Sequence, residues 1–514
     1  MNLTALLSLL PLALPVVHLL AACLNKQSYR SSLSLWLSSA GLGAALISAL
    51  AAFTFGETVQ TVAFISPATP SYLLAILVAF LGLIIGNFSR NYLAGDSQQV
   101  RFATMLHLTL AAVATVAVTD NLFVVLLAWM AVSLTLNELL LFYPERPRAV
   151  LAAHKKFIFA RIAECALLVA FIMLYQQHGT AQISAIVSAY PAELSGREHL
   201  ATCLIAFAAA IKCAQLPMHG WLIQVVEAPT PVSALLHAGV VNLGGYLLIL
   251  FAPLLSSSAP AITLLLFIAG LSATLASLIM VTRVTVKVKL AWSTVAQMGL
   301  MLVQCALGLY ELAMLHLMAH ACYKAYLFLR AGSAVQVKLA QQLSPSVTTS
   351  VQSWLLSAAI AGSSCVFAAH FIAPDGPLSP WLLLAAFLTV ALAEYDSVNR
   401  DRPPTTALAF SVALFLAYLL QKQLMSGLVA PATSSSIAGL ADIWVMFLIG
   451  VLISTWLLLR HTGDSEFTQT LRNWLFAGLF LDEWVTRTTL QIWPLRLPVR
   501  LPARSKRATA WEGE

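Results

Sequence analysis

Residues 201–220 read ATCLIAFAAAIKCAQLPMHG, an apolar stretch with a lysine near its middle. A helix that crosses the hydrocarbon core of a bilayer needs about 20 apolar residues. A charge at its centre costs at least about 2.5–3.5 kcal/mol on insertion scales, so Lys212 needs a partner, a water cavity or a function. Pro217 follows five residues later. It removes a backbone donor and breaks the helix, which exposes carbonyls that can hold an ion or water.

The rest of the chain has the composition of a membrane protein. Of its 514 residues, 60% are hydrophobic and 10% charged, against roughly 45–50% and about 25% in soluble domains. A soluble protein of this length could not hide so much apolar surface from water. The composition also excludes a disordered chain, a collagen-like chain and a disulfide scaffold. The net charge of +7 is explained by basic cytoplasmic loops. The positive residues form no stripe for a nucleic acid.

Apolar runs of about 20 residues predict an all-α polytopic membrane protein. We expect about fifteen transmembrane helices, within a range of 13–15, because the turns inside 102–143 and 287–335 are very short. The predicted spans are residues 3–24, 33–54, 71–94, 102–119, 121–143, 155–175, 200–220, 231–253, 261–282, 287–309, 311–335, 351–373, 378–396, 404–425 and 439–460.

Positive charges alternate between the loops. Those after odd-numbered spans, except the seventh, carry lysine or arginine, and the loop after the fifth span is expected to hold Lys155 and Lys156. Those after even-numbered spans are nearly free of positive residues, with Arg197 and Lys422 as exceptions. The positive-inside rule therefore predicts an external N-terminus and a cytoplasmic C-terminus.

The C-terminal fifty residues differ from the spans. Residues 465–495 mix aromatic and charged side chains and are predicted to lie in the membrane interface. The basic tail from Arg496 to Arg507 is read as a cytoplasmic segment near anionic headgroups, or as a dock for a partner. The chain thus divides into N-terminal helices at 1–100, a core at 101–400, C-terminal helices at 401–464, and this segment with its tail at 465–514.

Three titratable residues recur every fourth position in the span at 311–335. His316, His320 and Lys324 stack along one helix face over about 12 Å of axis. They form a proton wire if water joins them. A zinc site is disfavoured because HxxxH lacks the intervening glutamate of a zinc protease. A bis-histidine haem is disfavoured too, because it would need matching histidine pairs on two helices and the sequence does not show them. A purely structural role would leave three buried polar groups to be satisfied.

Other ionisable residues lie inside predicted spans. His237, about two turns into its span, is either a packed histidine or a relay beside the broken helix. Arg161 and Glu164, at i and i+3, predict an internal ion pair. Glu138 is close enough to the basic loop to pair with Arg146 or Lys156, or it acts on Lys212 by Coulomb attraction. Weaker candidates are Lys287, Lys289, His370 and Glu394.

Three ordered segments carry a resemblance to a known family. They are LPMHGWLIQVVEAPTPVSALLHAG at 216–239, KLAWSTVAQMGLM at 289–301 and HLMAHACYKAYLFLRAGS at 316–333. They resemble the antiporter-like subunits of complex I and of Mrp cation/proton antiporters, over roughly residues 100–335. The resemblance implies two inverted repeats of five helices, breaks in the seventh and twelfth helices, and a chain of buried charges at mid-membrane.

The resemblance also implies roles for particular residues. Those that match family positions in ion translocation are Lys212, His237, Lys287, His316, His320, Lys324, Arg161 and Glu164. Where the family places a glutamate after a tryptophan, Trp129 is followed here by Met130. Glu138 is the expected substitute, and His370 is the nearest candidate for the family's lysine in the twelfth helix. The long lateral helix of the largest complex I subunit is missing.

One branch of this family is especially similar, the DAB-type inorganic carbon transporters of the bacterial inner membrane. The stretch LFAGLFLDEWVTR at 475–487, followed by IWP at 492–494, resembles that branch. The resemblance implies a partner subunit, DabA, with a carbonic-anhydrase-like zinc site on the cytoplasmic face. No cofactor or metal is expected in this chain, whose seven cysteines form no CxxC or Cys/His ligand set. Its expected partners are the lipid bilayer and that subunit.

The function expected from these features is translocation of a cation, H⁺ before Na⁺, that energises accumulation of CO₂ or bicarbonate by the partner. The chain would then be a transporter subunit rather than an enzyme. Two alternatives stay open within the family, an Mrp-type Na⁺/H⁺ antiporter subunit and a complex I proton-pumping subunit. A structural membrane scaffold is a third, but it would not need Lys212, His316, His320 and Lys324 buried together.

Overall fold

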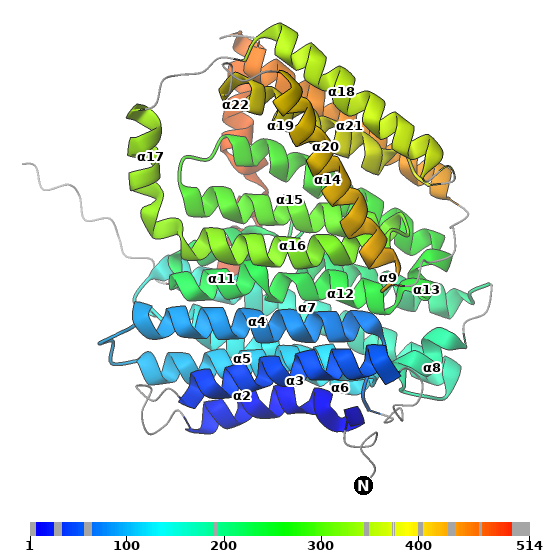
Figure 1. Ribbon diagram of the computed structural model, residues 1–514. Helices are drawn as coiled ribbons and strands as arrows, with labels where there is room; N and C mark the ends of the chain where they lie inside the picture. Colours follow the sequence, from blue (N-terminus) through cyan, green and yellow to red (C-terminus); the bar gives the residue numbers. More distant parts are fainter. Residues whose placement is uncertain are drawn as a thin grey trace, which may run out of the picture.

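Long helices form almost all of the structure, and most of them run along a common direction, with α18, α20 and α21 at a slant to it (Figure 1). The computed structural model describes residues 7–24, 33–55, 64–189, 193–343, 349–372, 374, 376–398, 404–429, 437–461 and 465–495. Within these ranges, the extended pairings are two isolated bridges, Ile65 with Thr119 and Asn121 with Gln182. The predicted all-α class is therefore confirmed.

The helices follow one another with few long connections. The first group is η1 (Leu10–Leu12), α2 (Ala13–Leu24), α3 (Leu33–Phe55), α4 (Thr69–Tyr92), α5 (Gln99–Val118), α6 (Leu122–Leu140) and α7 (Pro147–His178). The central group is α8 (Ile183–Ser188), α9 (Gly196–Lys212), α10 (Gly220–Gln224), η3 (Val225–Glu227), α11 (Thr230–Ala238), η4 (Val240–Asn242), α12 (Leu243–Leu250), α13 (Ala252–Ser257), α14 (Ala259–Val281), α15 (Val286–Ala306) and α16 (Tyr310–Leu329). The last group is η5 (Ala331–Ser333), α17 (Ala334–Leu343), α18 (Val351–Phe371), α19 (Ser379–Val398), α20 (Pro404–Ser426), α21 (Ala438–His461), α22 (Glu466–Phe476), η6 (Gly478–Phe480) and α23 (Leu481–Ile492).

Every predicted span coincides with a helix or with a pair of broken helices. Among the described residues, twelve helices or helix pairs are long and apolar enough to cross a membrane. The other predicted spans correspond to α9, α15 and α19. Helix α9 has 17 residues, because it ends at the lysine that precedes the predicted break. The number of fifteen crossings stays a prediction.

Two helices of the core are discontinuous. Helix α9 ends at Lys212, and the chain turns through residues 213–219 before α10 begins. The break expected around Pro217 is therefore confirmed. A second break separates α11 from α12 at Gly239 and η4. The break expected in the span at 351–373 is wrong, because α18 continues from Val351 to Phe371 without a proline to interrupt it.

The start of α7 corrects another expectation. Lys155 and Lys156 were expected in a loop, but α7 already begins at Pro147 and both lysines are buried. Proline suits the first turn of a helix because its missing N–H would have no partner there. The apolar residues 149–153 continue the helix from there, so that Lys155 and Lys156 lie on a helix inside the bundle rather than in a loop.

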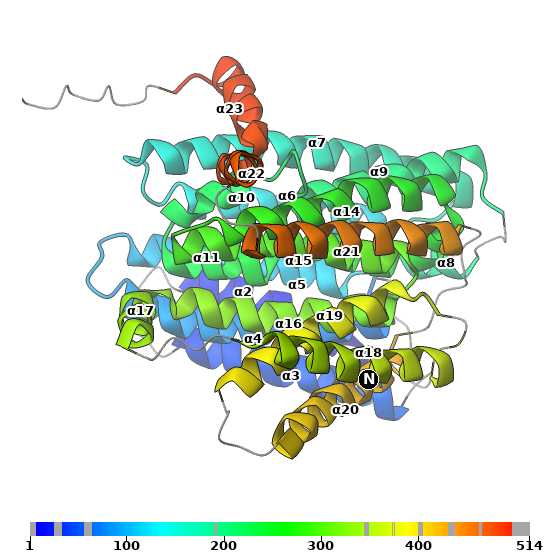
Figure 2. The same ribbon diagram turned by 90° about the horizontal axis from the view of Figure 1, so that it is seen from above.

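The amphipathic segment at the C-terminal end forms α22 and α23, which run across the direction of the bundle helices (Figure 2). They have 11 and 12 residues, too few to cross a bilayer, which takes about 20. Helix α23 packs against α7 and α10, and α22 packs against α14 and α21. The predicted basic tail from Arg496 to Arg507 lies outside the described residues.

The two discontinuous helices pack closely in the core. Gly244 of α12 faces the last turn of α9, where a Cβ at its position would lie 2.6 Å from both the Ala209 carbonyl oxygen and the Cys213 Sγ. Real Cβ atoms do not approach so closely. The site therefore requires glycine for close backbone contact rather than for a turn.

We expect Gly244→Ala to push α12 away from α9 and to lower the stability of the protein by about 1–3 kcal/mol, as overpacked cores do. Thermal unfolding of the purified protein in detergent measures this loss. Gly43→Ala on α3 is the control, because a Cβ there meets no atom within 4 Å. Equal melting temperatures for the two variants would contradict the close packing.

Candidate functional site

Lys212 lies at the C-terminal end of α9, beside a small cavity whose lining is mainly apolar apart from two lysines and a serine. Its ammonium is 4.4 Å from the centre of the Trp129 ring on α6, a cation–π contact. The cavity, of about 20 Å³, is also lined by Ser133, Lys156 and Trp221. A buried water needs roughly 10–15 Å³ and several polar partners. The cavity therefore has room for about one water between two lysines.

Glu138 is not near Lys212. It pairs instead with Arg101 of α5 at 2.8 Å, and both side chains are nearly half exposed. The expected pairs with Arg146 or Lys156 are wrong, and so is its expected position as the substitute at Met130. The reason is helical geometry: Glu138 is nine residues beyond Trp129, and nine steps of about 100° place it on the opposite face of α6.

The carboxylate that acts on Lys212 is Glu164 of α7, which interacts with it electrostatically. Glu164 accepts from Arg161 at 2.7 Å, so the predicted internal ion pair is confirmed. Arg161 also donates to the Ser133 hydroxyl at 3.1 Å. Lys156 donates to the same hydroxyl at 3.2 Å and to the Ser133 carbonyl. Ser133 thus joins the ion pair to the cavity beside Lys212.

Sequence reasoning missed Lys156 as a site residue. The signal available was Pro147, which starts the helix early enough to bury it. Seen from a helix that starts there, Lys156 and Ala163 are seven residues apart and share one face, and both line the cavity.

The second cluster gathers the histidines and the lysine of α16 around α11. Lys324 is fully buried and donates to the Leu290 carbonyl of α15 at 3.1 Å. The rings of His316 and His320 meet edge to face, with centroids 6.0 Å apart. His237 of α11 is fully buried, and both it and His320 interact electrostatically with Lys324. The predicted stacking of these residues along one helix is therefore confirmed, and His237 joins them.

Several polar atoms of this cluster are unpaired. Within the described part of the chain, both ring nitrogens of His237 and of His320 are buried without a hydrogen-bond partner. Buried polar groups are nearly always satisfied, by protein or by ordered water. His316 has one protein partner, the Gln304 amide oxygen at 3.0 Å. The cluster is therefore suited to hold water molecules that link the side chains.

The break between α11 and α12 lies between the two clusters. Val240 of η4 lines the cavity beside Lys212, and His237, three residues earlier, stacks on Phe328 in the second cluster at 4.3 Å. Asn242 donates to the Ala238 carbonyl at 2.6 Å, and its own amide oxygen has no partner among the described residues. A segment of irregular backbone that ends in Asn242 thus connects the two clusters.

The remaining predicted residues lie apart from these clusters. Lys287 joins the starts of α15 and α11 by donating to the Thr230 hydroxyl at 3.0 Å. His370 is exposed in the last turn of α18, with its ring edge-on to Phe371, so the structure does not bring it to the buried lysines. Lys289 and Glu394 are also exposed. In the described ranges, no three His, Cys, Asp or Glu side chains meet as a metal site.

Comparisons with known proteins agree with this geometry. Residues 119–346 match the family model described as NADH:quinone oxidoreductase/Mrp antiporter, transmembrane region. The chain is 43% identical over 493 residues to the probable inorganic carbon transporter subunit DabB of Hydrogenovibrio crunogenus, covering 95% of each chain. It is 35% identical to the probable subunit DabB2 of Halothiobacillus neapolitanus, covering 97% of this chain and 96% of the relative.

The fold is also similar to a solved structure, that of the Mrp complex from Dietzia sp. DQ12-45-1b. The TM-score is 0.60 at 21% identity, over 95% of this chain and 60% of the other. Fold and site together define an antiporter-like membrane subunit with buried basic residues at its broken helices. Within that class, the chain belongs to the DabB family of inorganic carbon transporter subunits.

We expect Ser133→Ala to lower the unfolding free energy by about 1–3 kcal/mol, because buried Lys156 and half-buried Arg161 lose a shared acceptor. Unfolding in detergent measures this change. The control is Ser454→Ala on α21, whose exposed hydroxyl donates to a carbonyl of its own helix. If the two substitutions lower the unfolding free energy equally, Ser133 does not link Lys156 and Arg161.

Proposed function

We propose that this chain translocates a cation, H⁺ before Na⁺, and that this flow energises the accumulation of inorganic carbon by a zinc-containing partner subunit. The observation that carries the proposal is the pair of buried basic clusters on either side of the break between α11 and α12. Ionisable groups inside a membrane protein typically mark ion pathways and proton relays. A structural scaffold has no use for Lys212, His237, His320 and Lys324 in such positions.

The chemistry of the clusters suits proton transfer. Lysine and histidine nitrogens both take up and release protons, and the unpaired nitrogens of His237 and His320 need partners such as water. The cavity beside Lys212 has the size for about one water. A proton would pass between Lys212 and the second cluster along the irregular segment at Val240.

The available energy is sufficient for this task. One proton that crosses roughly 150 mV releases about 3.5 kcal/mol. A tenfold concentration bias costs about 1.4 kcal/mol. One ion per carbon could therefore hold a bias of more than about a hundredfold. Ion flow must be coupled to the chemistry of the partner, since an uncoupled channel would only dissipate the membrane potential.

The partner we propose is a DabA-like subunit on the cytoplasmic face, with CO₂ hydration at its own zinc site. The similarity to proteins named DabB supports this assignment. The helices α22 and α23 are candidates for part of the contact, since they carry exposed aromatic side chains such as Trp474 and Trp484. The alternative is an Mrp-type antiporter subunit, which the shared fold supports.

We expect Lys212→Ala to abolish ion-driven bicarbonate accumulation while the complex stays assembled, because the cavity would lose its titratable amine. Uptake of labelled inorganic carbon by cells, with gel filtration of the tagged complex, measures both. Lys422→Ala is a matched control. Lys422 lies on α20, outside both clusters, and its ammonium also contacts a tryptophan ring, that of Trp381 on α19, at 5.1 Å. Normal uptake by the Lys212 variant would end the relay proposal, and loss of assembly would make Lys212 structural.

A gentle detergent pull-down of the tagged chain tests the partner. We expect one large partner subunit and about one zinc per complex, as a catalytic zinc site requires. A set of small membrane subunits without zinc would instead support the Mrp alternative. Partners with flavin and iron–sulfur clusters would move the chain to complex I.

A further inference from the structure

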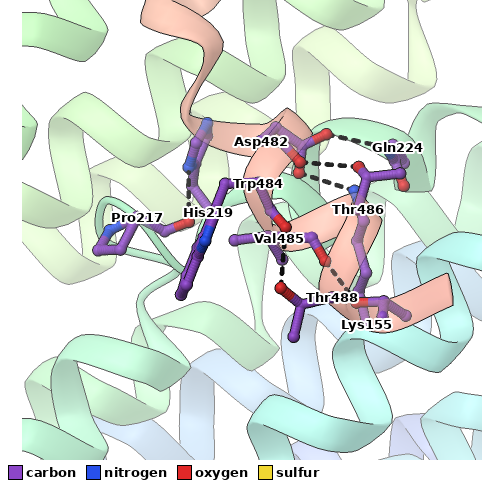
Figure 3. Close-up of polar contacts among 10 residues, drawn as sticks. Lys155, Pro217, His219, Gln224, Asp482, Trp484, Val485, Thr486 and Thr488 are labelled. Carbon is purple, nitrogen blue, oxygen red and sulfur yellow. Dashed lines mark hydrogen bonds and ion pairs between the residues drawn. The ribbon is translucent and has the colours of Figure 1, made fainter. Parts of the chain in front are cut away.

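A third polar cluster lies outside the two described above, where α23 inserts a carboxylate between α7 and α10 (Figure 3). The Asp482 Oδ1 is 2.7 Å from the ammonium of Lys155. Its Oδ2 accepts from the Gln224 amide at 3.0 Å. The Lys155 side chain is fully buried, but that of Asp482 is 33% exposed. The ion pair therefore connects solvent to the interior of the bundle.

His219 belongs to the same cluster. It is buried in the break after α9, with Nδ1 3.2 Å from the Pro217 carbonyl oxygen. It interacts electrostatically with both Asp482 and Lys155. Figure 3 shows its ring between the break and the start of α23. An ionisable ring thus lies between the exposed carboxylate and the broken helix.

Two helices place this cluster directly against the cavity beside Lys212. On α7, Lys155 binds Asp482, while the next residue, Lys156, lines the cavity. On α10, Gly220 abuts Asp482 so closely that a Cβ would overlap the carboxylate, while the next residue, Trp221, lines the cavity. On each helix, therefore, one residue contacts Asp482 and the next residue lines the cavity.

We propose that Asp482, with Lys155, Gln224 and His219, forms the solvent-facing port through which the translocated cation reaches or leaves the Lys212 cavity. This inference rests on the proposed function. A proton from water binds a carboxylate oxygen of Asp482 and then moves to a ring nitrogen of His219, which leaves the carboxylate ionised again. The amine of Lys155 holds the carboxylate in place between these steps.

Asp482 is not needed merely to fasten α22 and α23 to the bundle. Arg283 donates to the Leu475 carbonyl at 3.0 Å, and the Trp493 ring stacks on His154 with centroids 3.9 Å apart. These contacts hold the segment on either side of Asp482. The carboxylate itself is directed inward, between α7 and α10 (Figure 3).

The test measures ion-driven transport by the native complex in proteoliposomes, with variants of the full chain. We expect Asp482→Asn to reduce transport to background and Asp482→Glu to restore part of it, since a carboxylate returns. Glu483→Gln is the matched control, because it removes the next carboxylate on the same helix, which is exposed. Unchanged transport with Asp482→Asn would overturn the port.

A double variant separates the port from a structural role. Asp482→Asn alone leaves the buried charge of Lys155 uncompensated and can destabilise the protein. Asp482→Asn with Lys155→Gln removes both charges. If the ion pair is only structural, this neutral pair regains normal transport, and the inference fails. If the assembled double variant stays inactive, the port is supported.

Lys212→Ala in the same liposomes separates this inference from the function on which it rests. Loss of transport with Lys212→Ala and normal transport in the neutral pair would reject the port and keep the function. Transport that survives Lys212→Ala would reject the proposed function itself.

Discussion

The structure depends on one constraint: cations placed inside a membrane must be satisfied by the protein, because lipid offers them nothing. Four lysines lie in or beside the core within the described ranges. Each is met by a different group: the Asp482 carboxylate for Lys155, Ser133 for Lys156, the Trp129 ring for Lys212, and the Leu290 carbonyl for Lys324. Three of these partners are neutral. Neutral partners hold a charge less firmly than a carboxylate does, which suits groups that must change their charge.

The broken helices follow from the same constraint. A continuous helix uses all its backbone groups internally and leaves none for an ion or a water. The ends at Lys212 and Ala238 free such groups, and nearby side chains occupy some of them: Asn242 binds the Ala238 carbonyl, and Ser272 accepts from the N–H of Leu216. Irregular backbone at this depth is tolerated because it is enclosed by protein. It also positions the titratable side chains at the points where the helices stop.

The sequence predicted what a single helix determines. Apolar length located the spans, the i, i+3 spacing paired Arg161 with Glu164, and the i, i+4 spacing aligned His316 with His320. It failed where the partner lies on another element. Lys155 and Asp482 are 327 residues apart, and no local pattern relates them. Glu138 failed for a simpler reason, since helical periodicity already places it opposite Trp129. The role of the site residues in transport stays a prediction.

The nearest group to the Lys212 ammonium is an aromatic ring rather than a carboxylate, which has a consequence for ion movement. The resemblance to the antiporter-like family implies a glutamate where this chain has Met130. The lysine here contacts the ring of the preceding residue, Trp129. A cation–π contact contributes about 0.5–2 kcal/mol, whereas loss of one partner from a buried ion pair costs about 3–5 kcal/mol. The charge of Lys212 is thus stabilised less by its aromatic partner than it would be by a carboxylate. The nearest acidic influence comes from Glu164, which Arg161 already neutralises. A positive charge on Lys212 is therefore only weakly compensated, and under the proposed function this weak compensation would favour rapid release of a proton over tight storage.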